Sequence, residues 1–123
     1  MVEKEYVSWQ DVTDFLNTVA DHYKDANITG VYGFPTGGAI MAAILSKRMD
    51  IAWLMAPSGN CIIIDDIADS GETLLHYDRN SSGEKRKNYH IVTMYWKETS
   101  LVKPEFYSKI KTDKWIVYPW ENI

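Results

Sequence analysis

The stretch of the sequence best suited to chemistry is residues 65–73, Asp-Asp-Ile-Ala-Asp-Ser-Gly-Glu-Thr. It joins an acidic pair to a short loop that carries hydroxyl groups. The carboxylates of Asp65 and Asp66 can accept hydrogen bonds from vicinal hydroxyls or hold Mg²⁺. The hydroxyls of Ser70 and Thr73, together with the free amides of a helix N-terminus, can donate to a phosphate. A sugar phosphate would therefore fit both halves of the segment.

Two other interpretations fit an acidic pair of this kind. Aspartates commonly cap strands and helices, and a glycine such as Gly71 serves a turn, so the segment can be purely structural. Strand-end aspartates in a doubly wound sheet can also form a receiver-like pocket that binds Mg²⁺. The residue types alone leave both interpretations open.

The residues around this segment predict the elements that position it. Residues 61–64, Cys-Ile-Ile-Ile, form a continuous apolar run that predicts a strand buried on both faces and ending at the acidic pair. A helix is expected to begin near Gly71. Cys61 is the single cysteine and cannot form an intramolecular disulfide, so we expect an inert buried thiol.

The rest of the chain alternates helix and strand signals, without an internal repeat or a linker. Ser8 and Asp11 predict a capped helix over residues 9–24, where apolar residues recur at helical spacing. We expect further strands at 28–34, 51–55, 90–96 and 115–118, a helix at 39–48 and a polar loop at 80–83. This alternation predicts one α/β domain over residues 1–123, with a mainly parallel sheet of five strands. Ligands of such sheets bind at the carboxyl ends of the strands, where the strand order reverses.

Composition limits the partners of the chain. With 13 Lys and Arg against 17 Asp and Glu, the formal net charge is -4, which argues against charge-driven nucleic-acid binding. An anionic ligand would need backbone amides, a metal ion or a few well-placed cations. No stretch approaches the roughly 18 apolar residues of a membrane span, so we expect a cytoplasmic protein without a membrane partner.

Residues 61–73 closely resemble the signature with which type I phosphoribosyltransferases bind 5-phosphoribosyl-1-pyrophosphate (PRPP). The shared order is a hydrophobic strand, two acids, two variable residues, Asp, Ser, Gly, any residue and Thr. Three more segments match the family in order, so that the resemblance covers nearly the whole chain. They are the pyrophosphate loop at 33–38, the strand at 90–97 that delivers a base-binding lysine, and the hood over the base at 114–121. With Asp69 at its fifth place, the signature resembles that of the subgroup that acts on 6-oxopurines. The resemblance of the whole chain is closest to xanthine-guanine phosphoribosyltransferases.

The resemblance implies a doubly wound type I phosphoribosyltransferase fold with a small C-terminal hood. It implies a purine salvage enzyme that transfers the 5-phosphoribosyl group from PRPP to xanthine, guanine or hypoxanthine and releases pyrophosphate. Mg²⁺ is the implied cofactor, with Asp66 as its ligand and Asp69 as the catalytic acid or base. PRPP binding is implied for Thr36, Gly37, Gly38, Asp65, Asp66, Ala68, Asp69, Ser70, Gly71, Glu72 and Thr73. Purine binding is implied for Asp69, Lys97, Trp115 and Ile116. Trp115 would stack on the purine ring, Lys97 would donate to its 6-oxo group, and the Ile116 carbonyl would accept from a 2-amino group.

Two features depart from the family pattern. Thr36 stands where relatives carry Arg or Lys before the glycine pair, so we expect weaker pyrophosphate binding. Residues 56–60 form only a turn where relatives carry a long lid, and a lid excludes water and completes a site. A non-catalytic module that binds PRPP or a nucleotide is therefore the alternative function.

Without the resemblance, three of the assigned positions have simple structural explanations. Trp115 would belong to the core, Lys97 would be a solvated charge at a strand end, and the pair Gly37 and Gly38 would open a helix.

The resemblance also concerns assembly. Family members commonly form oligomers, and the surface of this chain is rich in aromatic residues, so a homo-oligomer is an expected partner state.

Overall fold

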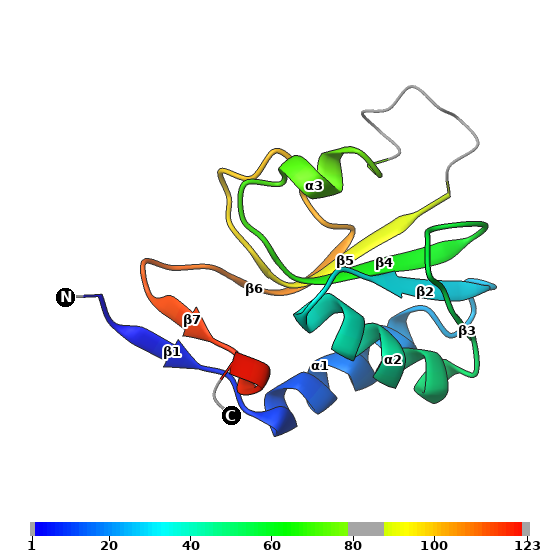
Figure 1. The fold of residues 1–123 in the computed structure, drawn as a ribbon, viewed down its shortest axis with the longest axis horizontal. Coiled ribbons are helices and arrows are strands. Elements are labelled where there is room, and N and C mark those ends of the chain that lie inside the picture. Colours follow the sequence, from blue (N-terminus) through cyan, green and yellow to red (C-terminus); the bar gives the residue numbers. More distant parts are fainter. Residues whose placement is uncertain (1, 79–87, 122–123) are drawn as a thin grey trace.

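The computed structural model describes residues 2–78 and 88–121, so the predicted polar loop at 80–83 lies outside the described residues. Within them, the main sheet contains five parallel strands, in agreement with the predicted α/β fold (Figure 1). The strands are β2 (Gly30–Gly33), β3 (Ala52–Trp53), β4 (Cys61–Ala68), β5 (His90–Trp96) and β6 (Phe106–Ile110). Their order is β3-β2-β4-β5-β6, and it reverses between β2 and β4.

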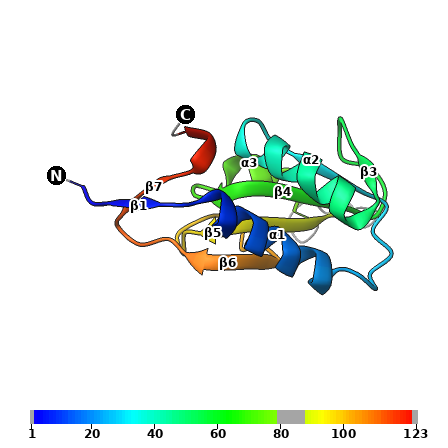
Figure 2. The ribbon, with the colours of Figure 1, turned by 90° about the horizontal axis from the view of Figure 1, so that it is seen from below.

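Helices cover both faces of this sheet. Helices α1 (Trp9–His22) and α2 (Gly37–Met49) pack on one face, and the short α3 (Glu72–Leu75) packs on the other. Figure 2 shows α1 and α2 in front of the strands, with α3 behind them. Among the described residues, no helix has the length and apolar character needed to cross a membrane.

Helix α1 forms where the sequence predicts it. The Ser8 hydroxyl accepts from the Asp11 amide, and the Asp11 carboxylate accepts from the Ser8 amide, which completes a capping box. One face of the helix is buried against the sheet, and each such aliphatic or aromatic side chain contributes about 1.5–3 kcal/mol. The buried residues are Val12, Phe15, Leu16 and Val19.

A separate two-stranded ribbon corrects the prediction for residues 115–118. Strand β7 (Trp115–Val117) pairs in parallel with β1 (Lys4–Tyr6), and the 3₁₀ helix η1 (Pro119–Glu121) follows it. The ribbon lies beyond the carboxyl ends of the main-sheet strands (Figure 1). The fifth strand of the main sheet is β6, which the sequence does not predict because an exposed edge strand needs few apolar residues.

Two further boundaries differ from the predictions, and both concern the candidate site. Strand β4 continues to Ala68 rather than ending at residue 64, because Asp65 pairs with Thr93 and Ile67 with Tyr95 of β5. Helix α2 begins at Gly37, so the glycine pair forms its first turn.

As predicted, Cys61 is fully buried, and burial raises the pKa of its thiol.

Candidate active site

The loop after β2 and the acidic pair in β4 meet where the strand order reverses. A Cβ atom added to Gly38 would lie 2.6 Å from the Ile64 carbonyl oxygen and 3.3 Å from Asp65 Oδ1. A Cβ atom added to Gly37 would lie 2.7 Å from Asp66 Oδ2. Only glycines therefore allow the start of α2 to approach the two carboxylates this closely.

The start of α2 is suited to an anion. Its first amides point out of the helix and have no acceptor within it, and the helix dipole makes this end positive. Thr36 occupies the N-cap position, is exposed, and makes no capping hydrogen bond through its side chain to the described residues. Its hydroxyl is therefore free to donate to a ligand, although a cation at this position is missing, as the sequence indicated.

Asp65 and Asp66 are half-buried, and the pKa values of both carboxyl groups are raised. Burial and the negative charge of Asp66 raise the pKa of Asp65 to about 8. Burial also raises the pKa of Asp66, and the charge of Glu121 adds to that effect. Asp65 Oδ1 accepts from the Asp66 amide at 2.9 Å, which fixes one carboxylate against the strand. A divalent cation or a pair of hydroxyl donors would relieve this arrangement.

The donor set fits Mg²⁺ only in partnership with a substrate. Carboxylate oxygens are the hard ligands that Mg²⁺ prefers, and it is commonly bound by one or two carboxylates plus phosphate oxygens and water. No group of three His, Cys, Asp or Glu side chains within residues 2–78 and 88–121 could hold a metal ion alone. Asp66, with Asp65 beside it, would contribute protein ligands, and a bound pyrophosphate group would contribute others.

The raised pKa of Asp65 predicts a stability penalty at neutral pH in the metal-free protein. The folded state keeps the proton to about pH 8, whereas an unfolded Asp releases it near pH 3.9, so the free energy of unfolding falls as pH rises between these values. Asp65→Asn should remove the penalty and stabilise the protein at about pH 8 by about 1 kcal/mol or more. Urea denaturation in EDTA at about pH 8 and about pH 5 measures this difference. An equal effect of the substitution at both pH values would contradict it.

Residues 69–73 form a loop after β4 and the start of α3, and the connection between β5 and β6 holds them in place. Lys97 donates its amide to the Ala68 carbonyl at 2.9 Å, and Leu101 donates to the Ser70 carbonyl at 2.9 Å. Gly71 has φ +81°, and a Cβ atom there would lie 2.4 Å from Ser100 Oγ and 2.9 Å from the Leu101 nitrogen. The sequence showed the loop itself but not the support from residues 97–102, which acts through backbone atoms.

Side chains of this loop remain accessible to a ligand. Asp69, Ser70, Glu72 and Thr73 are exposed, while Ala68 and Gly71 are buried beneath them. The Ser70 hydroxyl accepts from the Glu72 amide at 3.3 Å and can still donate its proton. Helix α3 has only four residues, so the contribution of a helix dipole here is small, and the loop amides and hydroxyls remain as phosphate donors.

Two residues that the sequence assigned to the purine lie together. Asp69 follows β4 and Lys97 follows β5, and the register pairs Ala68 with Trp96 just before them. Lys97 Nζ lies 3.5 Å from Asp69 Oδ1, and both side chains are about half exposed. A hydrogen-bond donor and an acceptor therefore stand side by side at the carboxyl end of the sheet.

Trp115 and Ile116 occupy opposite faces of the ribbon. Trp115 pairs with Lys4 and is 64% exposed, so it does not belong to the core. Ile116 pairs with Glu5 and is buried. Both lie on the two-stranded ribbon, whereas Asp69 and Lys97 follow strands of the main sheet. The exposed Trp115 indole offers a flat face on which a base could stack.

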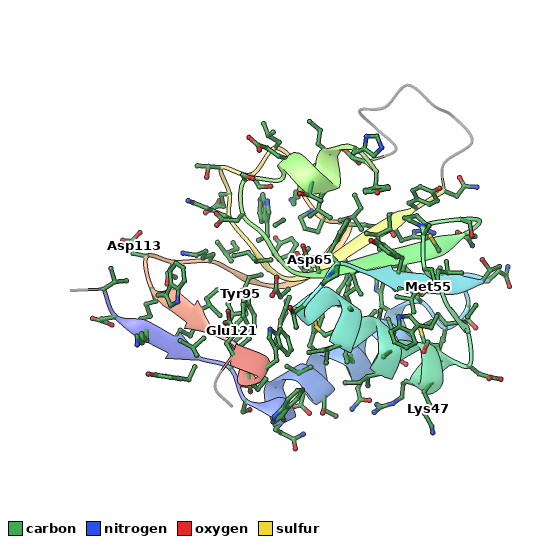
Figure 3. All side chains as sticks on the ribbon, viewed as in Figure 1. Lys47, Met55, Asp65, Tyr95, Asp113 and Glu121 are labelled. Atoms are coloured by element: carbon green, nitrogen blue, oxygen red, sulfur yellow. The ribbon has the colours of Figure 1, made fainter. Side chains whose placement is uncertain are left out.

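Three residues next to the acidic pair have no role that the sequence alone assigns. Tyr118 is 5% exposed and donates its hydroxyl to the Asp66 carbonyl at 3.3 Å. The Trp120 ring lies against Gly37, and the charge of Glu121 acts on Asp66. In Figure 3, Glu121 and Tyr95 lie on the side of Asp65 that faces the ribbon. No local spacing rule connects residues so distant in sequence.

Comparison with known proteins finds relatives only at the level of structure. No protein-family model matches the sequence, and no curated protein sequence matches it. The fold is similar to purine phosphoribosyltransferase from Pyrococcus horikoshii, with a TM-score of 0.82 and 25% identity over 98% of this chain and 95% of that one. It is similar to xanthine-guanine-hypoxanthine phosphoribosyltransferase from Helicobacter pylori, with a TM-score of 0.74 and 17% identity over 97% and 94%. It is also similar to a hypothetical protein from Neisseria gonorrhoeae with bound ppGpp, with a TM-score of 0.75 and 18% identity over 98% and 90%.

Proposed function

We propose that this chain, which has the fold of the type I phosphoribosyltransferases, transfers the 5-phosphoribosyl group of PRPP to a 6-oxopurine. The observation that supports this most is the meeting of three parts at the carboxyl ends of β2, β4 and β5. They are the glycine turn at 36–38, the acidic pair, and the Asp69–Lys97 pair. These are parts for a pyrophosphate, a ribose and a base, in the order in which PRPP and its acceptor present them.

In this proposal PRPP lies across the switch point between β2 and β4. Its pyrophosphate takes the amides of Gly37 and Gly38 and the Thr36 hydroxyl at the positive end of α2. Its ribose hydroxyls donate to Asp65 and Asp66, and its 5′-phosphate takes the amides and hydroxyls of residues 68–73. Bound Mg²⁺ would neutralise charge on the pyrophosphate, and Asp66 would hold it.

The transfer step replaces one bond at C1′ of the ribose with another. A purine nitrogen forms a bond to C1′ as the bond from C1′ to the pyrophosphate oxygen breaks, and the imidazole ring of the purine gives up one proton. Asp69 would take this proton, because an exposed carboxylate at the loop can act as a general base. The Asp65 and Asp66 carboxylates would stabilise positive charge that develops on the sugar.

The Asp69–Lys97 pair supports a 6-oxopurine over adenine. The 6-oxo group and N7 are neighbouring positions on the purine edge. The Lys97 ammonium can donate to the 6-oxo group while Asp69 accepts from a protonated ring nitrogen beside it. Adenine would place an amino donor against the ammonium and leave that donor unpaired, which a polar site rejects strongly. Trp115 would stack on the ring, and the Ile116 carbonyl would accept from a 2-amino group.

The proposal is tested by supplying PRPP, Mg²⁺ and one base at a time to the purified protein. We expect guanine, xanthine or hypoxanthine to give a nucleotide with one equivalent of pyrophosphate, and adenine and orotate to give neither. Chromatography of the nucleotide and an assay of pyrophosphate measure the two products separately. Pyrophosphate release without a base would indicate hydrolysis at an open site. PRPP binding without any pyrophosphate release would favour the non-catalytic binding module instead.

Trp115→Ala should weaken binding of the product nucleotide by about 1–3 kcal/mol, the scale of base stacking on an aromatic side chain. PRPP alone should bind as before, because the ribose and phosphate parts lie on the main sheet. Calorimetric titration with GMP and with PRPP and Mg²⁺ gives both affinities. Trp53→Ala is the matched control, since Trp53 is 56% exposed on the edge strand β3. Equal loss of both ligands in the Trp115 variant would contradict a stacking role.

A further inference from the structure

The indole of Trp120 fills a place in the site that the proposed reaction does not explain. A Cβ atom added to Gly37 would lie 2.4 Å from Trp120 Cζ2 and 2.7 Å from Trp120 Cε2. The ring therefore lies directly against the first turn of α2, on which the pyrophosphate would be bound. Gly37 has no side chain because the indole and the Asp66 carboxylate occupy that space.

We propose that Trp120 is a positioning residue, which holds the turn at Gly37 and Gly38 in the conformation that binds pyrophosphate. This inference rests on the proposed function and extends it to a residue that would touch no substrate atom. A hydrogen-bond site made of backbone amides has no side-chain rotamer to define it. It depends on whatever packs behind the backbone.

The ring of Trp120 is itself held on two sides. It stacks on Tyr118, with ring centroids 5.1 Å apart and an interplanar angle of 5°. Trp9, the first residue of α1, meets it edge to face at 6.0 Å. Aromatic contacts of this kind fix both the position and the tilt of a ring. The indole can therefore transmit a defined position from the hood to the glycine turn.

Tyr118 connects this packing to the acidic pair. Its hydroxyl donates to the Asp66 carbonyl at 3.3 Å, and its amide donates to Glu121 Oε1 at 3.0 Å. Its ring meets Tyr95 at 6.2 Å, and the Tyr95 hydroxyl donates to Glu5 of β1. Trp120 thus contacts the glycine turn and Tyr118 contacts the acidic pair, while in the proposed function Trp115 and Ile116, a few residues earlier, would contact the base.

This division predicts a selective defect when the indole is removed. Trp120→Ala should weaken binding of magnesium pyrophosphate about 10-fold or more, because a misplaced turn loses donors aimed at the anion. GMP has no pyrophosphate group, so its affinity should stay within about twofold. Trp120→Phe keeps a ring against Gly37 and should restore most of the pyrophosphate affinity. A residue needed only for folding would lower both affinities together.

Calorimetry with magnesium pyrophosphate and with GMP on the full chain tests the inference, with Trp53→Ala as the control for loss of an indole. Trp9→Ala is a second variant, which removes the edge-to-face contact on the Trp120 ring without changing a residue of the glycine turn. Because Trp9 is 49% exposed, this variant should fold even where Trp120→Ala does not, and it should lower the affinity for magnesium pyrophosphate more than that for GMP. Unchanged pyrophosphate binding in either folded variant, or a parallel loss of GMP, would overturn the positioning role. A wild-type protein that binds neither magnesium pyrophosphate nor PRPP would overturn the proposed function itself.

Discussion

Replacement of both Asp65 and Asp66 by asparagine is expected to abolish Mg²⁺-dependent binding of PRPP, with a loss of about 100-fold or more. Amides keep the size of the carboxylates but lose the charge that holds Mg²⁺ and strengthens hydrogen bonds from ribose hydroxyls. Both residues lie within β4, so their backbone positions should survive the change. Titration of PRPP with and without Mg²⁺ measures the effect.

The stability of the double variant separates this loss from unfolding. Because burial raises the pKa of both carboxyls, the amides should make the metal-free protein more stable at neutral pH. A variant that is more stable and binds no PRPP would have lost a ligand site and kept its fold. Asp21→Asn with Asp25→Asn is a matched control, since both of these residues are exposed and the charge change is the same. Normal PRPP binding by the Asp65 and Asp66 variant would contradict the proposal that these carboxylates bind the ribose hydroxyls.

Asp69→Asn should preserve PRPP binding while it lowers the turnover number by about 100-fold or more, the usual scale for removal of a general acid or base. The amide can occupy the same place beside Lys97 but cannot take a proton from the purine. The turnover number and the Michaelis constant for PRPP, measured with guanine, separate the two effects.

The Asp69 variant needs a control of the same charge change nearby. Glu98→Gln is suitable, because Glu98 is exposed and follows Lys97 directly. Its turnover should stay within about twofold of the wild type. Unchanged turnover in Asp69→Asn would remove Asp69 from the chemistry, whereas equal losses in both variants would point to the total charge around Lys97.

The elements that could be predicted from the sequence are those whose burial follows a simple period. Helix α1 matches within two residues at its end, and β5 matches at both ends, because their apolar residues face a core. Strand β6 could not be found, since Ser108 and Lys109 lie on an exposed edge. The extension of β4 was missed because an acidic pair usually marks the end of a strand. Here it continues, with Asp65 paired to Thr93.

The residues of the candidate site also differ in whether a local sequence pattern reveals them. Residues 65–73 are contiguous, so a candidate chemistry can be read from their order, and the structure brings Asp69 and Lys97 within 3.5 Å of each other. Tyr118 and Trp120 act through ring packing and through backbone atoms of residues far away in the chain. Such contacts depend on the tertiary fold and leave no local pattern. Candidate ligand residues could therefore be proposed from the sequence, whereas the residues that pack behind them could not.

The pairing of β1 with β7 has a consequence for the order in which the molecule assembles. Residues 4–6 meet residues 115–117 across nearly the whole described chain, so this ribbon closes the longest loop in the fold. Closing a loop of that length costs conformational entropy before the new contacts compensate for it. The pairing of only three residues on each strand contributes little stabilising free energy against that cost. The sheet around β4 and β5 can form first from nearer neighbours. The ribbon that carries Trp115 would then be the last part to form and the first to open, in a local unfolding event that leaves the acidic pair in place.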